Sequence, residues 1–225
     1  ALQGFLQIEP NSKKLKPYVQ YRIGKMFCYG LGTEQNYQKA FEWFERSAKQ
    51  KNKFAQFSLA NLYYYGSGIE KDLSQAFVWY QRSSSQGQPY AAYSIAQMYR
   101  YGEYVTKDND TAQRYYKQAL SGFLKIESDD MANDDLFYKL GQMFNLGLGT
   151  DSDVTKAIEY FRRSAEMNNK NGLFEYGKAL LTGEHIPQDT DSAVKLLEKA
   201  VKLKNSNAKR FLALEYISGE HLEQD

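Results

Sequence analysis

The chain has 225 residues, of which 42% are hydrophobic and 25% are charged, with 29 Lys and Arg against 27 Asp and Glu. This composition is typical of a folded globular protein and excludes an intrinsically disordered chain. The sequence contains no uninterrupted apolar stretch of about 18 residues, which disfavours a membrane-spanning helix, and its even charge balance disfavours direct contact with nucleic acid.

The chain is built from repeats, and its first segment is a partial one. ALQGFLQIEP, from Ala1 to Pro10, is similar to QALSGFLKIES, from Gln118 to Ser128, which follows the alanine of a later repeat. We therefore expect residues 1–12 to form the second helix of an incomplete repeat, and the natural protein to continue beyond both ends. The next residues include a small basic cluster, which a surface link explains: Lys13, Lys14 and Lys16.

A motif then returns with a period of 36 residues. The segment GKMFCYGLGTEQNYQKAFEWFERSA, which begins at Gly24, returns at Ala60 as ANLYYYGSGIEKDLSQAFVWYQRSS. A fixed period of this length predicts a solenoid of stacked repeats. Three positions mark the register: a small residue at Gly24, Ala60, Ala96, Gly141, Gly177 and Ala213; a glycine at Gly30, Gly66, Gly102, Gly147, Gly183 and Gly219; and an alanine at Ala40, Ala76, Ala112, Ala157 and Ala193.

The spacing of these markers is 36 residues except between the third and fourth repeats, where it is 45, so the link after Ala119 is stretched. We predict a single repeat domain over residues 1–225. It consists of a half repeat at 1–12, full repeats at about 16–51, 52–87, 88–132, 133–168 and 169–204, and a half repeat at 205–225.

Each repeat is expected to form two helices, about twelve in all and without strands. In QFSLANLYYYG, the apolar residues between Phe57 and Tyr63 stand at spacings of three and four, which is typical of a helix. Gly66 is expected to end this helix in the left-handed conformation. An Asn or Asp four residues before each repeat alanine is expected to cap the second helix: Asn36, Asp72, Asp108, Asp153 and Asp189.

The turns between the two helices contain a second glycine in three of the repeats, at Gly32, Gly68 and Gly149. Repeats 3 and 5 have Tyr104 and His185 at this position. Because a side chain disfavours the left-handed conformation that glycine adopts freely, we expect these two turns to differ from the others.

These motifs resemble the Sel1-like repeats, a subgroup of the tetratricopeptide-like helical hairpins. The shared pattern is A/G-x-M/L-Y/F-x-x-G-x-G followed by D-x-x-x-A-x-x-W/Y-Y/F, and it is met at Gly24 to Phe44, with Asn36 at the Asp position, and at Ala60 to Tyr80. The resemblance implies an all-α fold, a right-handed α-solenoid of helical hairpins. The stretched link with SGFLKIES also resembles the repeat tails of mobilisation proteins (relaxases) from Gram-positive conjugative elements.

The family resemblance implies a non-catalytic scaffold that binds a protein or peptide in the groove lined by the first helix of each hairpin. Tyrosine and arginine are the residue types that anchor such interfaces, although tyrosines at these spacings also fill the seams between hairpins, and the sequence leaves both interpretations open. The expected partner-binding residues of repeats 1 to 3 are Tyr18, Tyr21, Lys25, Phe54, Phe57, Asn61, Tyr64, Tyr90, Tyr93, Gln97 and Arg100. The same register adds Cys28 in repeat 1, and Asp135, Tyr138, Gln142 and Asn145 in repeat 4.

Catalysis and metal or cofactor binding find little support in the sequence. The chain has one cysteine, Cys28, and two histidines, His185 and His221, which occupy the same loop position one repeat apart. The acidic pairs Asp129 with Asp130 and Asp134 with Asp135 lie in the stretched link, where solvated charge explains them. We therefore expect no catalytic residue, no metal and no cofactor.

Three functions are weighed on this basis. A protein-binding scaffold comes first, an accessory repeat module of a DNA-mobilisation relaxase comes second, and an enzyme comes last. A single cysteine requires no oxidising compartment, which favours the cytoplasm.

Overall fold

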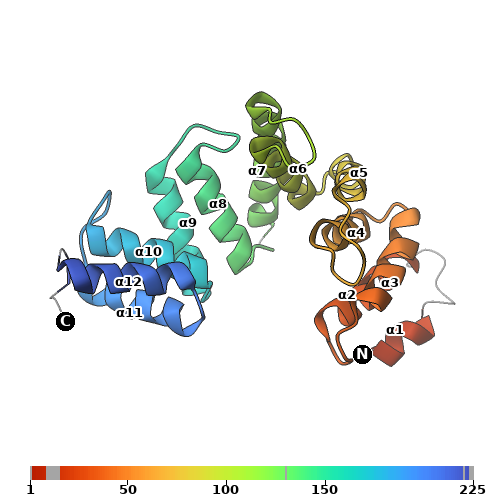
Figure 1. Cartoon of the computed structure of the whole chain (residues 1–225), viewed down its shortest axis with the longest axis horizontal. Coiled ribbons are helices and arrows are strands. Elements are labelled where there is room, and N and C mark those ends of the chain that lie inside the picture. Colours follow the sequence, from red (N-terminus) through yellow and green to blue (C-terminus); the bar gives the residue numbers. More distant parts are fainter. Residues whose placement is uncertain (1, 9–15, 130, 220, 223–225) are drawn as a thin grey trace. The chain divides into compact units, whose positions relative to one another are not determined.

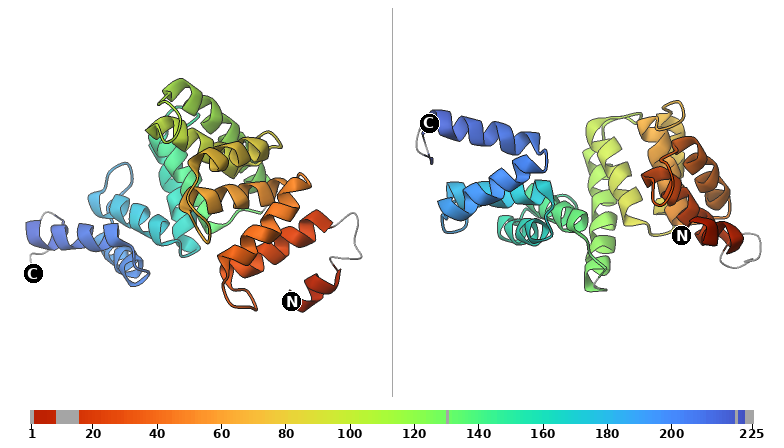
Figure 2. Two further views of the ribbon diagram at one scale, coloured as in Figure 1. Left: turned by 45° about the vertical axis from the view of Figure 1, so that its right-hand side comes forward. Right: turned by 90° about the horizontal axis from the view of Figure 1, so that it is seen from below.

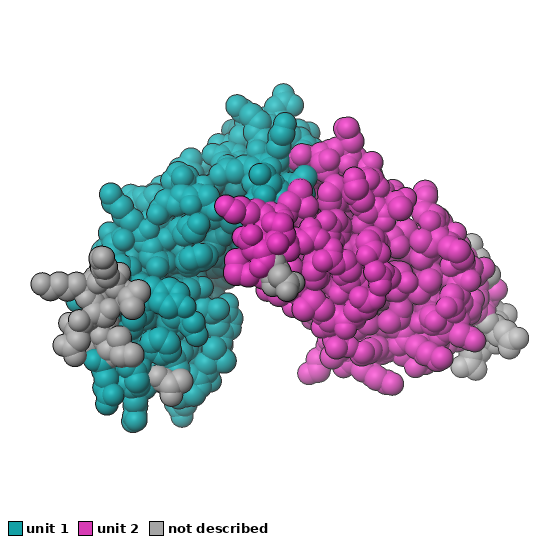
Figure 3. Space-filling view, turned by 180° about the vertical axis from the view of Figure 1, so that it is seen from behind, with its two compact units in different colours: residues 1–122 teal, residues 123–225 magenta. Residues whose placement is uncertain are grey.

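The computed structural model describes residues 2–8, 16–129, 131–219 and 221–222. These residues form twelve α-helices and no strand (Figure 1). They belong to two compact units, residues 1–122 and residues 123–225, which Figure 3 distinguishes by colour. The predicted all-α fold of repeated helical hairpins is confirmed, as is the predicted number of helices. Lys13, Lys14 and Asp130 lie outside the described residues.

Unit 1 is a stack of antiparallel helical hairpins (Figures 1 and 2). The even-numbered helices are the first helices of their hairpins, and the odd-numbered helices that follow are the second helices. The elements are α1 (Leu2–Ile8), α2 (Lys16–Tyr29), α3 (Tyr37–Lys49), α4 (Lys53–Tyr65), α5 (Leu73–Ser84), α6 (Pro89–Tyr101) and the larger part of α7 (Asn109–Ser128).

Unit 2 repeats the same arrangement with two further hairpins and a single last helix. It begins within α7 at Phe123 and continues with α8 (Asp134–Leu146), α9 (Val154–Glu166), α10 (Lys170–Thr182), α11 (Thr190–Lys202) and α12 (Ser206–Ser218).

The helix ends follow the chemistry predicted from the sequence. The side chain of Asp72 accepts hydrogen bonds from the Ser74 hydroxyl at 2.6 Å and from the backbone N–H groups of Ser74 and Gln75 at 2.9 and 3.0 Å. The Ser74 hydroxyl bond, followed by the backbone bonds, holds the pKa of Asp72 below its ordinary value. Asn36, Asp108, Asp153 and Asp189 accept equivalent bonds. The first helices end at left-handed glycines with φ between 62° and 72°: Gly66, Gly102, Gly147, Gly183 and Gly219.

The turns of repeats 3 and 5 keep the backbone conformation of the glycine turns. Tyr104 and His185 both have φ of 66°, close to the 70° of Gly32 and the 72° of Gly68. The prediction that these two turns differ is therefore wrong for the backbone. The short connection between a left-handed helix end and the next capping residue imposes the positive φ, and the two side chains adopt it at a cost of about 1–2 kcal/mol each.

The stretched link between repeats 3 and 4 lengthens a helix. α7 has 20 residues, whereas the other second helices have 12 or 13. The other hairpins turn at a left-handed residue in this register, namely Lys51, Gly87, Asn168 and Lys204, but α7 continues through the equivalent Phe123, which is fully buried. Near its end, the Glu127 carboxylate accepts a 2.8 Å hydrogen bond from the Tyr160 hydroxyl and pairs with the Arg163 guanidinium.

Close contact between the two helices of a hairpin explains the small residues at the repeat positions. Ala60 and Ala76 are fully buried. At Gly24 a Cβ atom would lie 2.5 Å from the Phe44 ring, and at Gly141 it would lie 2.5 Å from the Phe161 ring, so glycine is required where this ring presses on the first helix. Buried serines join the same helix pairs. The Ser83 hydroxyl donates to the Lys53 carbonyl at 2.7 Å, and Ser164 donates to the Asp134 carbonyl at 2.7 Å.

Candidate partner-binding face

The first helices of unit 1 carry aromatic rings that touch from one repeat to the next. The Tyr21 ring centroid lies 6.5 Å from that of Tyr18 in the same helix and 5.8 Å from that of Phe54 in the next hairpin. The Phe57 ring centroid lies 6.0 Å from that of Tyr90. We call the six rings on these helices the aromatic face: Tyr18, Tyr21, Phe54, Phe57, Tyr90 and Tyr93.

The aromatic face has inner rings and outer rings. Each inner ring packs against a buried ring of the second helix: Tyr21 on Phe44, Phe57 on Tyr80 and Tyr93 on Tyr116, with centroid distances of 6.0, 5.9 and 5.5 Å. Burial raises the pKa of Tyr21 to about 12, which disfavours its phenolate form. Two outer rings remain open to solvent, Tyr18 with 44% and Phe54 with 41% of its surface exposed.

The predicted polar residues of this surface fall into two groups. Asn61 and Tyr64 are already engaged, because Asn61 accepts a 2.6 Å hydrogen bond from the Tyr80 hydroxyl and the Tyr64 hydroxyl donates to Glu103. Lys25 and Arg100 lie over rings instead. The Lys25 ammonium is 5.9 Å from the Tyr21 centroid and 5.7 Å from that of Tyr29, and the Arg100 guanidinium is 5.6 Å from that of Tyr101. Gln97 is half-buried on α6.

Cys28 is half-buried at the end of α2. Burial raises the pKa of the Cys28 thiol, so the thiolate that nucleophilic or metal chemistry needs is disfavoured.

The predicted residues of repeat 4 lie in unit 2. Asp135 forms an ion pair with Lys139 at 3.5 Å, and the Tyr138 hydroxyl accepts a 2.9 Å bond from the Gln142 amide. Tyr138 packs on Phe161 as its counterparts in unit 1 pack on their second helices, and Asn145 is exposed.

A second row of tyrosines, which the predicted site residues did not include, lies at the ends of the first helices of unit 1. The last residues of α2, α4 and α6 are Tyr29, Tyr65 and Tyr101, which are 62%, 71% and 63% exposed. The signal was present in the sequence, because each of these tyrosines directly precedes the repeat glycine and the spacing is 36 residues. Together with Tyr18 and Phe54, they make the first helices of unit 1 unusually rich in exposed aromatic surface.

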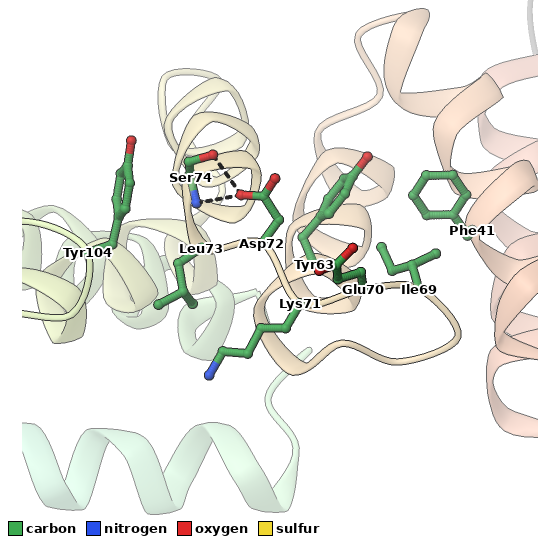
Figure 4. A pocket seen from close by; sticks show the side chains of 9 residues that line it. All are labelled: Phe41, Tyr63, Ile69, Glu70, Lys71, Asp72, Leu73, Ser74 and Tyr104. Carbon is green, nitrogen blue, oxygen red and sulfur yellow. Dashed lines mark hydrogen bonds between the residues drawn. The ribbon is translucent and has the colours of Figure 1, made fainter.

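A pocket of about 640 Å³ lies elsewhere in unit 1, beside the turn that follows Gly66. Figure 4 shows Phe41, Ile69 and Tyr63 at one end of the lining and Tyr104 at the other, with the Asp72 carboxylate bonded to Ser74 between them. None of the predicted partner-binding residues lines this pocket.

The described residues contain no group of three or more His, Cys, Asp or Glu side chains placed to hold a metal ion. His185 is exposed, and the Nδ1 atom of His221 lies 2.9 Å from a carboxylate oxygen of Glu215. Over the same part of the chain, every helix is too short or too polar to cross a bilayer.

Comparison with known proteins agrees with this architecture. A search of curated proteins found no significant relative. The structure is similar to a Sel1 repeat protein from Oxalobacter formigenes, with a TM-score of 0.67 and 23% identity over 100% of this chain and 94% of the other. It is also similar to a Sel1 repeat protein from Klebsiella pneumoniae, with a TM-score of 0.57 and 18% identity over 93% of this chain and 96% of the other. These likenesses show the fold.

The sequence itself matches a family model. The model of the Sel1 repeat matches five segments, residues 17–52, 53–88, 89–122, 138–169 and 171–205, which together make up most of the chain. With five matched repeats and the corresponding hairpins in the structure, the chain belongs to the Sel1 repeat family.

Proposed function

We propose that this chain is a non-catalytic scaffold that binds a peptide or protein partner on the aromatic face of unit 1. Sel1-repeat proteins generally mediate protein–protein interaction, which supports the class of function. The observation that carries the proposal is the exposure of Tyr18 and Phe54 on rigid helices, directly beside inner rings that fix their positions.

The layering of the rings suits such a role. The inner rings pack against the second helices and hold the surface in shape, whereas the outer rings leave about half of their area for a partner. Aromatic side chains with few rotatable bonds lose little conformational entropy on binding, and they account for a large share of interface hot spots. The partner is expected to cross several repeats, because the rings of successive hairpins are in contact.

The relaxase module, the second function considered from the sequence, is not proposed. The similar structures described above are Sel1 repeat proteins, and none of these comparisons supports a relationship to mobilisation proteins.

Peptide selection tests the proposal directly. A library of random peptides displayed on phage is selected against the full chain, and the affinity of the enriched peptides is then measured by calorimetry. We expect Tyr18→Ala and Phe54→Ala each to weaken binding at least about tenfold, because truncation of a hot-spot ring typically costs about 2 kcal/mol or more. Tyr37→Ala is the matched control, since Tyr37 is a similarly exposed ring, 37%, on the second helix α3.

Variants of the inner rings test whether these rings support both binding and stability. Phe57→Ala and Tyr93→Ala are expected to weaken binding and also to lower the melting temperature, whereas Lys156→Ala on α9 leaves both unchanged. Enriched peptides that bind the Tyr18 and Phe54 variants with the affinity of the parent would contradict the proposed surface.

A further inference from the structure

The first helices of unit 1 carry positive charge only. α2, α4 and α6 together contain five basic residues, Lys16, Arg22, Lys25, Lys53 and Arg100, and no Asp or Glu. The whole chain has a formal net charge of only +2. The acidic residues of the chain therefore lie outside the helices that carry the aromatic face.

Four of these cations lie over aromatic rings and have no carboxylate within ion-pair distance among the described residues. The cation lies 5.8 Å from the Tyr18 centroid for Arg22, 5.9 Å from that of Tyr21 for Lys25, and 5.5 Å from that of Phe54 for Lys53. Arg100 lies over Tyr101, as described above. A cation over a ring keeps its charge uncompensated, because the ring attracts it without neutralising it.

The first helices of unit 2 differ in this respect. α8 has Asp134 and Asp135 as well as a lysine, and α10 has Glu175 beside Lys178. The Asp135–Lys139 ion pair compensates the lysine of α8 within its own helix. First helices with basic residues and no carboxylate are thus found in unit 1, whereas α8, α10 and α12 of unit 2 each contain at least one carboxylate.

We propose that the aromatic face of unit 1 recognises an acidic peptide segment that also carries apolar or aromatic side chains. This inference rests on the proposed function and specifies its partner. Carboxylates of the peptide would approach Arg22, Lys25 and Arg100 and form charge-assisted hydrogen bonds, while its apolar side chains would cover the open parts of Tyr18 and Phe54.

A single-stranded nucleic acid fits this surface less well. Bases stack on the open faces of aromatic rings. The cations lie over the faces of Tyr18, Tyr21 and Phe54, and the rings are tilted by 30° to 48° against their neighbours, so these faces are occupied. Five basic residues over three helices also match a few carboxylates better than a continuous row of phosphates.

The test uses the selected peptides and a charge-neutralised triple variant of the full chain, Arg22→Gln, Lys25→Gln and Arg100→Gln. We expect the enriched peptides to be richer in Asp and Glu than the library, and to bind the triple variant at least about tenfold more weakly than the parent. Their affinity for the parent should fall as salt is raised. The control removes three exposed lysines from unit 2, Lys170→Gln, Lys178→Gln and Lys195→Gln, and should leave the affinity unchanged. Circular dichroism and the melting temperature establish that both variants are folded.

The outcomes separate this inference from the proposed function. Peptides without an acidic excess that bind the triple variant as tightly as the parent, yet still depend on Tyr18 and Phe54, overturn the acidic partner and leave the proposed function standing. A selection that enriches no peptide dependent on Tyr18 or Phe54 contradicts both. Binding of an oligothymidine or oligouridine of about 20 nucleotides that is tighter than that of every peptide, and that the triple variant loses, would show a nucleic-acid surface and overturn the inference.

Discussion

Single residues with unusual backbone conformation show where the repeat imposes its geometry on the sequence. Among the residues that the structure describes, five other than glycine have positive φ: Lys51, Tyr104, Asn168, His185 and Lys204. Lys51, Asn168 and Lys204 stand at the position of Gly87 in repeat 2, so the turn after the second helix has the same conformation with or without a side chain. The sequence did not reveal this because the conformation comes from the closure of the turn and not from the residue that occupies it.

Replacement of Lys204 by glycine tests this strain. Lys204 has φ of 62° and an exposed side chain, so Lys204→Gly removes a left-handed side chain without loss of packing. We expect the free energy of unfolding to rise by about 0.5–1 kcal/mol, which is the left-handed cost less the greater freedom of glycine in the unfolded chain. Chemical denaturation measures the change. Lys202→Gly is the control, because Lys202 ends α11 in a helical conformation and glycine there should destabilise by up to about 1 kcal/mol. Equal effects of the two substitutions would show that the turn is unstrained.

Glu175 on α10 is a half-buried carboxyl. It has no hydrogen bond or ion pair within the described part of the chain, and it lines a cavity of about 110 Å³ in unit 2. Burial raises its pKa above the ordinary value of 4.5, and the charge of Lys178 opposes this shift. Because the folded state holds the proton more tightly than the unfolded state, stability falls as the pH rises above about 4.5.

Glu175→Gln should therefore raise the melting temperature at pH 7 and change it little at pH 4, where the carboxyl of the parent is protonated. Glu198→Gln on α11 is the control, since Glu198 is exposed. An increase in melting temperature that is the same at pH 7 and at pH 4 would mean that side-chain shape, and not charge, limits stability at this position.

At the scale of helices, the sequence predicted the caps and ends that depend on local hydrogen bonding. It did not predict the helix length that depends on packing between hairpins. The caps at Asn36 and Asp72 and the glycine helix ends follow from local chemistry, and the structure contains them as predicted. The extension of α7 through Phe123 was not predicted, because it depends on the burial of that ring and on the bonds of Glu127 to Tyr160 and Arg163 in a later hairpin.

For the aromatic face too, the sequence predicted some features and not others. The 36-residue register was sufficient to place the six rings on the first helices of unit 1, where successive repeats bring them into contact. The difference between inner and outer rings depends on the size of the opposing residue, such as Phe44 or Tyr80, and a periodic pattern does not contain it. Arg22 and Lys53 were missed because a charge over a ring leaves no mark in residue spacing.

The contact between the two helices of a hairpin is tested by enlargement of its small residues. Ala60→Leu and Ala76→Leu each add volume where no space remains, and we expect a cost of about 1–3 kcal/mol in the free energy of unfolding. Ala213 occupies the same repeat position as Ala60 but is exposed on α12, so Ala213→Leu should be nearly neutral. Thermal denaturation that gives the same melting temperature for all three variants would show that the assigned register is wrong.

For the molecule as a whole, repetition supplies the same hairpin several times while its surface chemistry changes along the chain. The first helices of unit 1 carry contacting rings and cations without a carboxylate among them, and those of unit 2 each contain at least one carboxylate. The scaffold thus has a common core and locally distinct surfaces, which is how repeat proteins acquire specific partners on a uniform fold.

Amide hydrogen exchange of the full chain, with and without a selected peptide, tests the central claim most directly, because it locates the bound surface without any mutation. The account predicts slower exchange on binding in α2, α4 and α6, with no change in α8, α10 or α12. Protection confined to residues 66–74 beside the 640 Å³ pocket, or to the helices of unit 2, would contradict it.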